Sequence, residues 1–284
     1  MTRARAELPL GVFDSGLGGL TVVRALRRAL PSERVVYLGD TARVPYGTRS
    51  SETILRYARS CADQLVRRGI KALVVACNTA SAVALEMLRA ELDLPVIGVV
   101  EPGARAAVAL ADEVSASAGR AVRIGVLGTA RTVQSGAYPR AVAALTGRYE
   151  VLGAQAPLLV PLVEEGWLDG EVPRLAVQRY LEPLIASGVG VVVLGCTHYP
   201  LLEPVIREVA ARLSDGRVEV VDSARACADD IQSLLSARDL GRGGDALADV
   251  HALELLVTDM PTGFAAVAER FLGHAVEEVE QVDL

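Results

Sequence analysis

Short apolar runs alternate with amphipathic stretches along the first half of the chain. Four runs have the length of buried strands: residues 10–13, 35–38, 73–76 and 95–100. Apolar side chains three and four positions apart predict helices between them: from Thr21, over 51–68 and over about 80–92. Because strands joined by helices run parallel, this half predicts a parallel sheet with helices on both faces.

The same order of elements starts again near residue 122. Further strands are predicted at 122–129, 149–152, 189–194 and 218–222, with a helix over 172–185. Val126 follows Val12 by 114 positions and Cys196 follows Cys77 by 119, and such similar offsets indicate an internal duplication. The segment 236–248 is predicted as a surface loop, followed by a strand at 255–258 and a helix at 263–272.

The expected fold is therefore α/β, with two similar open, mainly parallel-sheet domains. The first domain is expected to comprise 1–101 plus 217–284, and the second 102–216.

Composition narrows the class of protein. No apolar run among the 284 residues reaches the roughly 18 needed to span a membrane, and the first residues lack the apolar core of a signal peptide. We therefore expect a cytoplasmic protein with no membrane partner. The net charge of −6 argues against a nucleic-acid partner. Four scattered cysteines indicate free thiols, with neither a disulfide framework nor a metal site.

Two of those cysteines occupy matched places in the duplication. Cys77 and Cys196 each follow a buried apolar strand, at the sheet edge where open α/β proteins bind ligands. Backbone N–H groups at the start of a following helix would favour the thiolate. Two matched thiols predict two-base chemistry, in which one removes a proton and the other returns one on the opposite face. Cys61 and Cys227 instead lie on apolar helix faces and are predicted to be core residues.

Polar side chains follow the first two strands. Asp14 and Ser15 open a glycine-rich turn that does not match the G-x-G-x-x-G spacing of dinucleotide-binding loops. Ser15 offers a hydroxyl to a small ligand, while Asp14 could orient an amine, activate a nearby thiol or cap the turn. Asp40 follows the second strand, where assistance to a thiol and a capping role both remain open. Tyr46 and Gly47 lie in a turn after Pro45.

The second cysteine has a histidine close by. His198 lies two residues after Cys196 and could stabilise its thiolate or carry its proton. Glu164 is a weaker candidate, because a solvated helix end explains it equally well.

Four segments together resemble the glutamate racemases of the aspartate/glutamate racemase family: residues 12–19, 40–47, 76–81 and 194–202. The resemblance implies an isomerase without cofactor or metal that interconverts L- and D-glutamate and supplies peptidoglycan synthesis. It also implies two domains related by pseudo-twofold symmetry, with the active site between them.

Residue roles follow from the same resemblance. Cys77 and Cys196 would be the acid/base pair. Asp14, His198 and Glu164 would assist them, with Asp40 as a weaker candidate. The residues implied to bind the substrate are Asp14, Ser15, Tyr46, Gly47, Asn78, Thr79, Thr197 and His198.

Several alternatives remain. The same thiol chemistry would serve a racemase of aspartate or another acidic amino acid, and paired α/β lobes also occur in ligand-binding proteins. A secondary role as an inhibitor of a DNA-processing partner has only the acidic charge in its support. Pyridoxal chemistry is disfavoured, because the only lysine, Lys71, directly precedes a buried strand. A homodimer is possible, since dimers are the commonest closed assembly.

Overall fold

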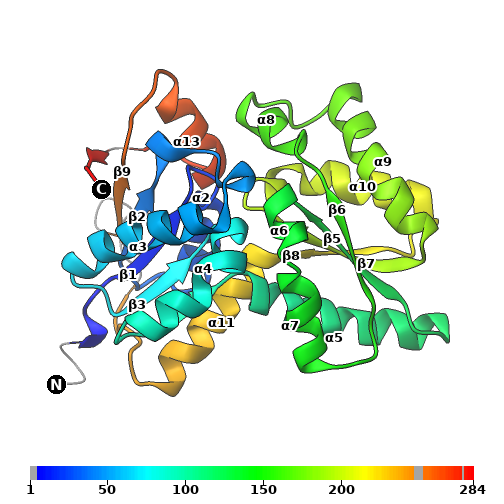
Figure 1. The fold of residues 1–284 in the computed structure, drawn as a ribbon, viewed down its shortest axis with the longest axis horizontal. Helices are drawn as coiled ribbons and strands as arrows, with labels where there is room; N and C mark the ends of the chain where they lie inside the picture. The colour runs from blue at the N-terminus through cyan, green and yellow to red at the C-terminus, as the bar shows by residue number, and fades with distance from the viewer. Residues whose placement is uncertain (1–4, 246–251, 277) are drawn as a thin grey trace. The chain divides into compact units, whose positions relative to one another are not determined.

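The part of the chain that the structure describes forms two all-parallel sheets (Figure 1), which confirms the α/β class. The computed structural model describes residues 5–245, 252–276 and 278–284. The first sheet has the order β10-β9-β2-β1-β3-β4 and the second the order β6-β5-β7-β8. The strands of the first sheet are β1 (Leu10–Asp14), β2 (Val35–Gly39), β3 (Ala72–Val75), β4 (Val96–Gly98), β9 (Leu253–Val257) and β10 (Glu280–Gln281). Those of the second are β5 (Arg123–Gly128), β6 (Val151–Gln155), β7 (Val189–Gly195) and β8 (Glu219–Asp222).

Helices cover these sheets as expected for parallel strands. The first sheet carries α2 (Leu20–Ala29), η1 (Thr41–Arg43), η2 (Tyr46–Thr48), α3 (Ser51–Arg67), α4 (Asn78–Glu91), α11 (Ser223–Ala237) and α13 (Phe264–Leu272). The second carries α5 (Val100–Ala118), α6 (Ala130–Gln134), α7 (Ala137–Leu145), α8 (Leu159–Glu164), α9 (Glu171–Ala186), η3 (Tyr199–Leu202) and α10 (Glu203–Ser214). Within the first group α3 packs on α4 and α2 on α13; within the second, α5 packs on α7 and α9 on α10. In the part of the chain described, no helix is long and apolar enough to cross a membrane.

The chain divides into two compact units. The first unit comprises Met1–Val99 and Ala224–Leu284, and the second Val100–Ser223. The second boundary lies beyond the residue 216 expected from the sequence, because β8 pairs with β7 and so belongs to the second sheet. The first unit is discontinuous in sequence, since β9 returns to pair with β2.

The internal duplication is visible in the strand order. The order β2-β1-β3-β4 of the first sheet is repeated as β6-β5-β7-β8 in the second. Val12 on β1 pairs with Val74, and Val126 on β5 pairs with Val193. Cys77 and Cys196 each lie three positions beyond these partners (77 − 74 and 196 − 193). The two thiols therefore occupy the same topological position in their sheets.

Two sequence-based expectations need correction. The strand expected at 95–100 ends at Gly98, and α5 begins at Val100. Pro102 is compatible with that start because the first turn of a helix has no N–H bonds for proline to remove. The loop expected at 236–248 begins later, since α11 extends to Ala237; its last residues, 246–248, fall outside those described.

Candidate functional site

The candidate residues of the first unit gather where its strand order reverses. The chain passes from β1 outward to β2 and then returns to β3 on the other side of β1. In open α/β sheets this reversal leaves a crevice at the carboxyl ends of the strands, where ligands bind. The Asp14 turn follows β1 and Cys77 follows β3, so both lie at this position. In the second unit, Cys196 follows β7, which lies next to β5 after the same kind of reversal.

Cys77 caps the amino terminus of α4. Its backbone is extended and its sulfur accepts a hydrogen bond from the N–H of Ala80 at 3.5 Å. Cys77 Sγ and Ser15 Oγ lie 3.5 Å apart, with the thiol able to donate. Only 6% of Cys77 is exposed. The positive end of the α4 dipole favours the thiolate, whereas the Ser15 hydroxyl can accept from the thiol or donate to the thiolate.

Asp14 fixes the turn that carries Ser15. Its Oδ2 accepts hydrogen bonds from the N–H groups of Gly16 at 3.3 Å and Gly19 at 2.9 Å. A Cβ at Gly19 would lie 2.6 Å from the Cβ of Asp14, so this turn requires glycine there. Of the roles left open for Asp14 by the sequence, the capping role is present in the structure.

Asp40 holds the loop that contains Tyr46. Its buried carboxylate accepts two contacts from Arg43 Nε at 2.9 and 2.7 Å, a hydrogen bond from the Tyr46 hydroxyl, and one from Thr258 Oγ1 at 3.0 Å. Burial raises the pKa of Tyr46, with smaller contributions from Cys61 and Asp40, so its hydroxyl stays a donor. Both side chains are thus engaged inside the protein, and the Tyr46 carbonyl accepts a hydrogen bond from the N–H of Arg49 at 3.0 Å.

The remaining candidates of the first unit lie on the first turn of α4. Asn78 and Thr79 are each 2% exposed and follow Cys77 directly. Cys61 and Cys227 are fully buried, which confirms that both are core residues. Cys61 also lies 3.9 Å from the Tyr46 hydroxyl, beneath the loop that Asp40 holds.

In the second unit a histidine lies between a thiol and a carboxylate. Cys196 Sγ is 3.8 Å from His198 Nδ1, and His198 Nε2 is 3.1 Å from Glu164 Oε1. Burial alone would lower the pKa of His198, but hydrogen bonds to Cys196 and Glu164 outweigh it and raise that pKa to about 10. His198 is therefore an imidazolium at neutral pH, and its positive charge lies beside the Cys196 sulfur. Thr197 Oγ1 lies 3.4 Å from the same Nδ1.

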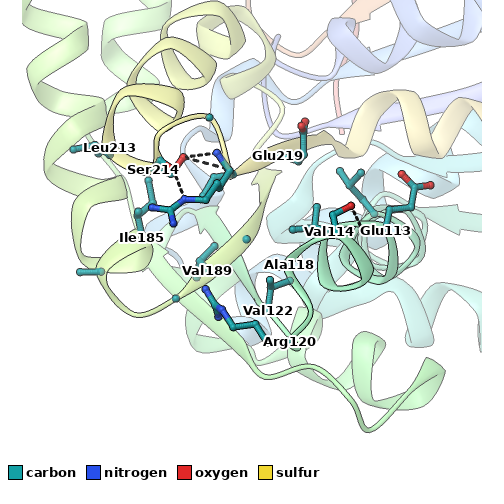
Figure 2. Close-up of a pocket in the computed structure, with 18 of the residues that line it drawn as sticks. Glu113, Val114, Ala118, Arg120, Val122, Ile185, Val189, Leu213, Ser214 and Glu219 are labelled. Atoms are coloured by element: carbon teal, nitrogen blue, oxygen red, sulfur yellow. Dashed lines mark hydrogen bonds between the residues drawn. The ribbon is translucent and has the colours of Figure 1, made fainter.

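A large pocket in the second unit lies elsewhere. It has a volume of about 780 Å³ and is lined by the ends of α5, α9 and α10 and by residues at or just before the starts of β5, β7 and β8, among them Val122, Val189 and Glu219 (Figure 2). The pocket is therefore at the amino edge of the sheet, whereas Cys196 follows the carboxyl end of β7. None of the candidate residues predicted from the sequence lines it.

The match to a family model identifies the chain as an isomerase of the racemase class. The family model described as Asp/Glu/Hydantoin racemase matches residues 18–231, which is most of the chain.

Similar proteins define the family more closely. A glutamate racemase of Geobacter metallireducens is 47% identical over 275 residues, covering 97% of this chain and 96% of that protein. One of Syntrophus aciditrophicus is 45% identical over 285 residues, covering all of both. A crystal structure of a Thermus thermophilus glutamate racemase in complex with β-chloro-D-alanine has a TM-score of 0.83 and 42% identity, with 98% of each chain covered. Another from Francisella tularensis, in complex with D-glutamate, has a TM-score of 0.85 and 33% identity, again over 98% of each chain. The chain belongs to the glutamate racemases of the Asp/Glu/Hydantoin racemase family.

Proposed function

We propose that this chain interconverts L- and D-glutamate with Cys77 and Cys196 as its two acid/base groups. The observation that carries the proposal is the duplicated strand order, which gives each unit one thiol at the same position beyond its sheet. Cys77 has the amino terminus of α4 and the Ser15 hydroxyl beside it, and Cys196 has His198. D-Glutamate is a building block of peptidoglycan, so the activity would supply cell-wall synthesis.

The reaction requires proton transfer on both faces of the glutamate Cα. One thiolate takes the Cα proton, so that an S–H bond forms as the C–H bond breaks and the electron pair spreads into the α-carboxylate. The other thiol then gives its proton to the opposite face of Cα. The product is the other enantiomer, and the two sulfurs have exchanged their protonation states. Because either thiol can begin as the base, the same pair serves both directions.

The α-carboxylate needs hydrogen-bond donors where charge develops. The first turn of α4 offers backbone N–H groups together with the side chains of Asn78 and Thr79, and the Asp14 turn offers Ser15. In the second unit Thr197 would bind the substrate, with His198 both binding it and stabilising the Cys196 thiolate. Glu164 would assist through His198, and Asp14 would assist Cys77. In this proposal Asp40 does not contact the substrate but holds in place the loop that contains Tyr46 and Gly47.

Three further expectations belong to this proposal. The two units would be the two domains that contribute to one active site, because both thiols must reach the same Cα. The protein would act in the cytoplasm, where cell-wall precursors are made, and would form a homodimer.

A hydrogen-exchange experiment tests the chemistry. Purified protein is incubated with L-glutamate in heavy water without added cofactor, and optical rotation and Cα deuterium are followed together. We expect the rotation to decay to zero while deuterium appears at Cα. Loss of rotation without Cα deuterium would refute proton abstraction by a thiol.

Single substitutions test the assignment of the thiols. Cys77→Ser and Cys196→Ser should each reduce kcat by several orders of magnitude, because a hydroxyl is a far weaker acid than a thiol. Cys227→Ala is the control, since this fully buried cysteine lies on α11 in the core. An equal loss in all three variants would contradict the division into catalytic and core cysteines.

A further inference from the structure

A buried tyrosine supports the turn beside Cys77. Tyr37 lies in the middle of β2, where it pairs with Val12 of β1, and its side chain is fully buried. Its hydroxyl donates a hydrogen bond to the carbonyl of Gly16 at 2.8 Å. A side chain from one strand thus reaches the turn that follows the neighbouring strand.

The turn also lies directly against the backbone of Gly39, which has no side chain. A Cβ placed at Gly39 would lie 2.4 Å from the Gly16 carbonyl oxygen and 3.3 Å from Cε1 of Tyr37. No side chain fits there without moving the turn. This close approach therefore fixes the distance between the Gly16 carbonyl and the end of β2.

These contacts hold Gly16 through both of its backbone polar groups. Its N–H donates to Asp14 Oδ2 at 3.3 Å, and its carbonyl accepts from Tyr37. Ser15 lies directly before this fixed residue, and its Oγ is 3.5 Å from Cys77 Sγ. We propose that Tyr37 is a positioning residue for Cys77, because it holds the Asp14–Gly19 turn so that the Ser15 hydroxyl stays beside the sulfur. This proposal rests on the proposed role of Cys77 as a base.

The arrangement suits a thiol that changes its charge. When Cys77 is a thiolate, the Ser15 hydroxyl can reverse and donate to it, which stabilises the anion. Burial raises the pKa of Tyr37 well above its usual range, and the charges of Asp14 and Cys77 raise it further. Tyr37 therefore keeps its proton and remains a donor to Gly16 whichever state Cys77 adopts.

Alkylation of the thiols tests this role. Wild type and Tyr37→Phe are treated with iodoacetamide over a range of pH, and the modification of Cys77 and of Cys196 is measured separately by peptide mass spectrometry. We expect the Cys77 rate at pH 7 to fall about 3- to 10-fold, because weaker stabilisation of the anion leaves less thiolate at that pH. The two proteins should converge at high pH, where Cys77 is fully ionised. Cys196 should keep its wild-type profile.

A matched control lies in the second unit. Tyr199 is also fully buried and donates through its hydroxyl to a backbone carbonyl, that of Ala156, at 2.8 Å. Tyr199→Phe removes the same kind of hydrogen bond and should leave the Cys77 profile unchanged. Gly39→Ala perturbs the same turn from another side and should slow Cys77 alkylation as Tyr37→Phe does.

The possible results separate positioning from general damage. An unchanged Cys77 rate in Tyr37→Phe would overturn the proposal, and so would a parallel change at Cys77 and Cys196. Faster Cys77 alkylation would overturn it as well, because this would indicate opening of a buried site. Alkylation needs no turnover, so a chain that failed to racemise glutamate could still show the effect of Tyr37 on Cys77. The racemase assay and the alkylation assay can therefore fail independently.

Discussion

Substitution of Lys71 by methionine tests the buried ion pair of the first unit. Lys71 Nζ lies 2.5 Å from Glu33 Oε2 and donates to the carbonyls of Ala6 at 2.8 Å and Leu240 at 2.9 Å. The Lys71 and Glu33 side chains are 0% and 2% exposed. The single ammonium group thereby joins the starts of β2 and β3 to two segments far away in the sequence.

The size of the effect follows from what the substitution leaves behind. Methionine fills the space of the aliphatic stem but leaves the Glu33 carboxylate buried without its cation. Removing one partner of a buried ion pair costs about 3–5 kcal/mol, more than an exposed pair would. Replacing both residues, in Lys71→Met/Glu33→Leu, removes the isolated charge. We expect the double variant to be more stable than the single variant by at least about 1 kcal/mol.

Urea unfolding measures the free energy of unfolding of the single and the double variant. Far-UV circular dichroism follows the whole chain, and labelling of the fully buried Cys61 follows the first unit alone. With a slope of roughly 2–3 kcal/mol per molar urea, the single variant should lose about 1 to 2.5 M in the midpoint of the first unit. A single variant with a wild-type midpoint, or a double variant less stable than the single one, would refute the reasoning.

Three further substitutions give expectations of different kinds. His198→Asn removes a cation whose pKa is about 10, so Cys196 alkylation at pH 7 should fall about tenfold. A wild-type rate would contradict the conclusion that His198 is charged at this pH. Glu164→Gln should slow the same alkylation less than fivefold, because the Glu164 side chain is 52% exposed; a larger effect than that of His198→Asn would reverse their order. Asp40→Asn places an amide against the Arg43 and Tyr46 donors and should lower the unfolding free energy by about 2–4 kcal/mol in urea titration, whereas an unchanged midpoint would show that Asp40 does not hold this loop.

The local pattern of apolar residues predicts most of the strands. It also separates the cysteines that follow a strand from the cysteines on the apolar face of a helix. Each buried strand of a parallel sheet reads as a continuous apolar run, and helix spacing of three and four separated Cys61 from Cys77. The sequence pattern did not predict α5, because Pro102 and Gly103 are unfavourable inside a helix. Their place in its first turn makes them acceptable.

Partners remote in sequence could not be predicted from one chain. Thr258 donates to Asp40 across 218 positions, and the sequence around Thr258 carries no sign of that contact. Tyr37 looked like an ordinary strand residue, since nothing in an apolar run indicates which way its hydroxyl points. The ion pair of Lys71 with Glu33 is likewise a product of the fold, because each residue lies before a different strand.

The discontinuous first unit has a consequence for synthesis of the chain on the ribosome. The second unit has all four of its strands once β8 has emerged, whereas β2 waits for β9, more than two hundred residues further along. Until then the buried strand Val35–Gly39 has an unpaired edge of the kind that promotes pairing between chains. A newly made chain is therefore most vulnerable to aggregation through its first unit, during the interval in which the second unit is already complete.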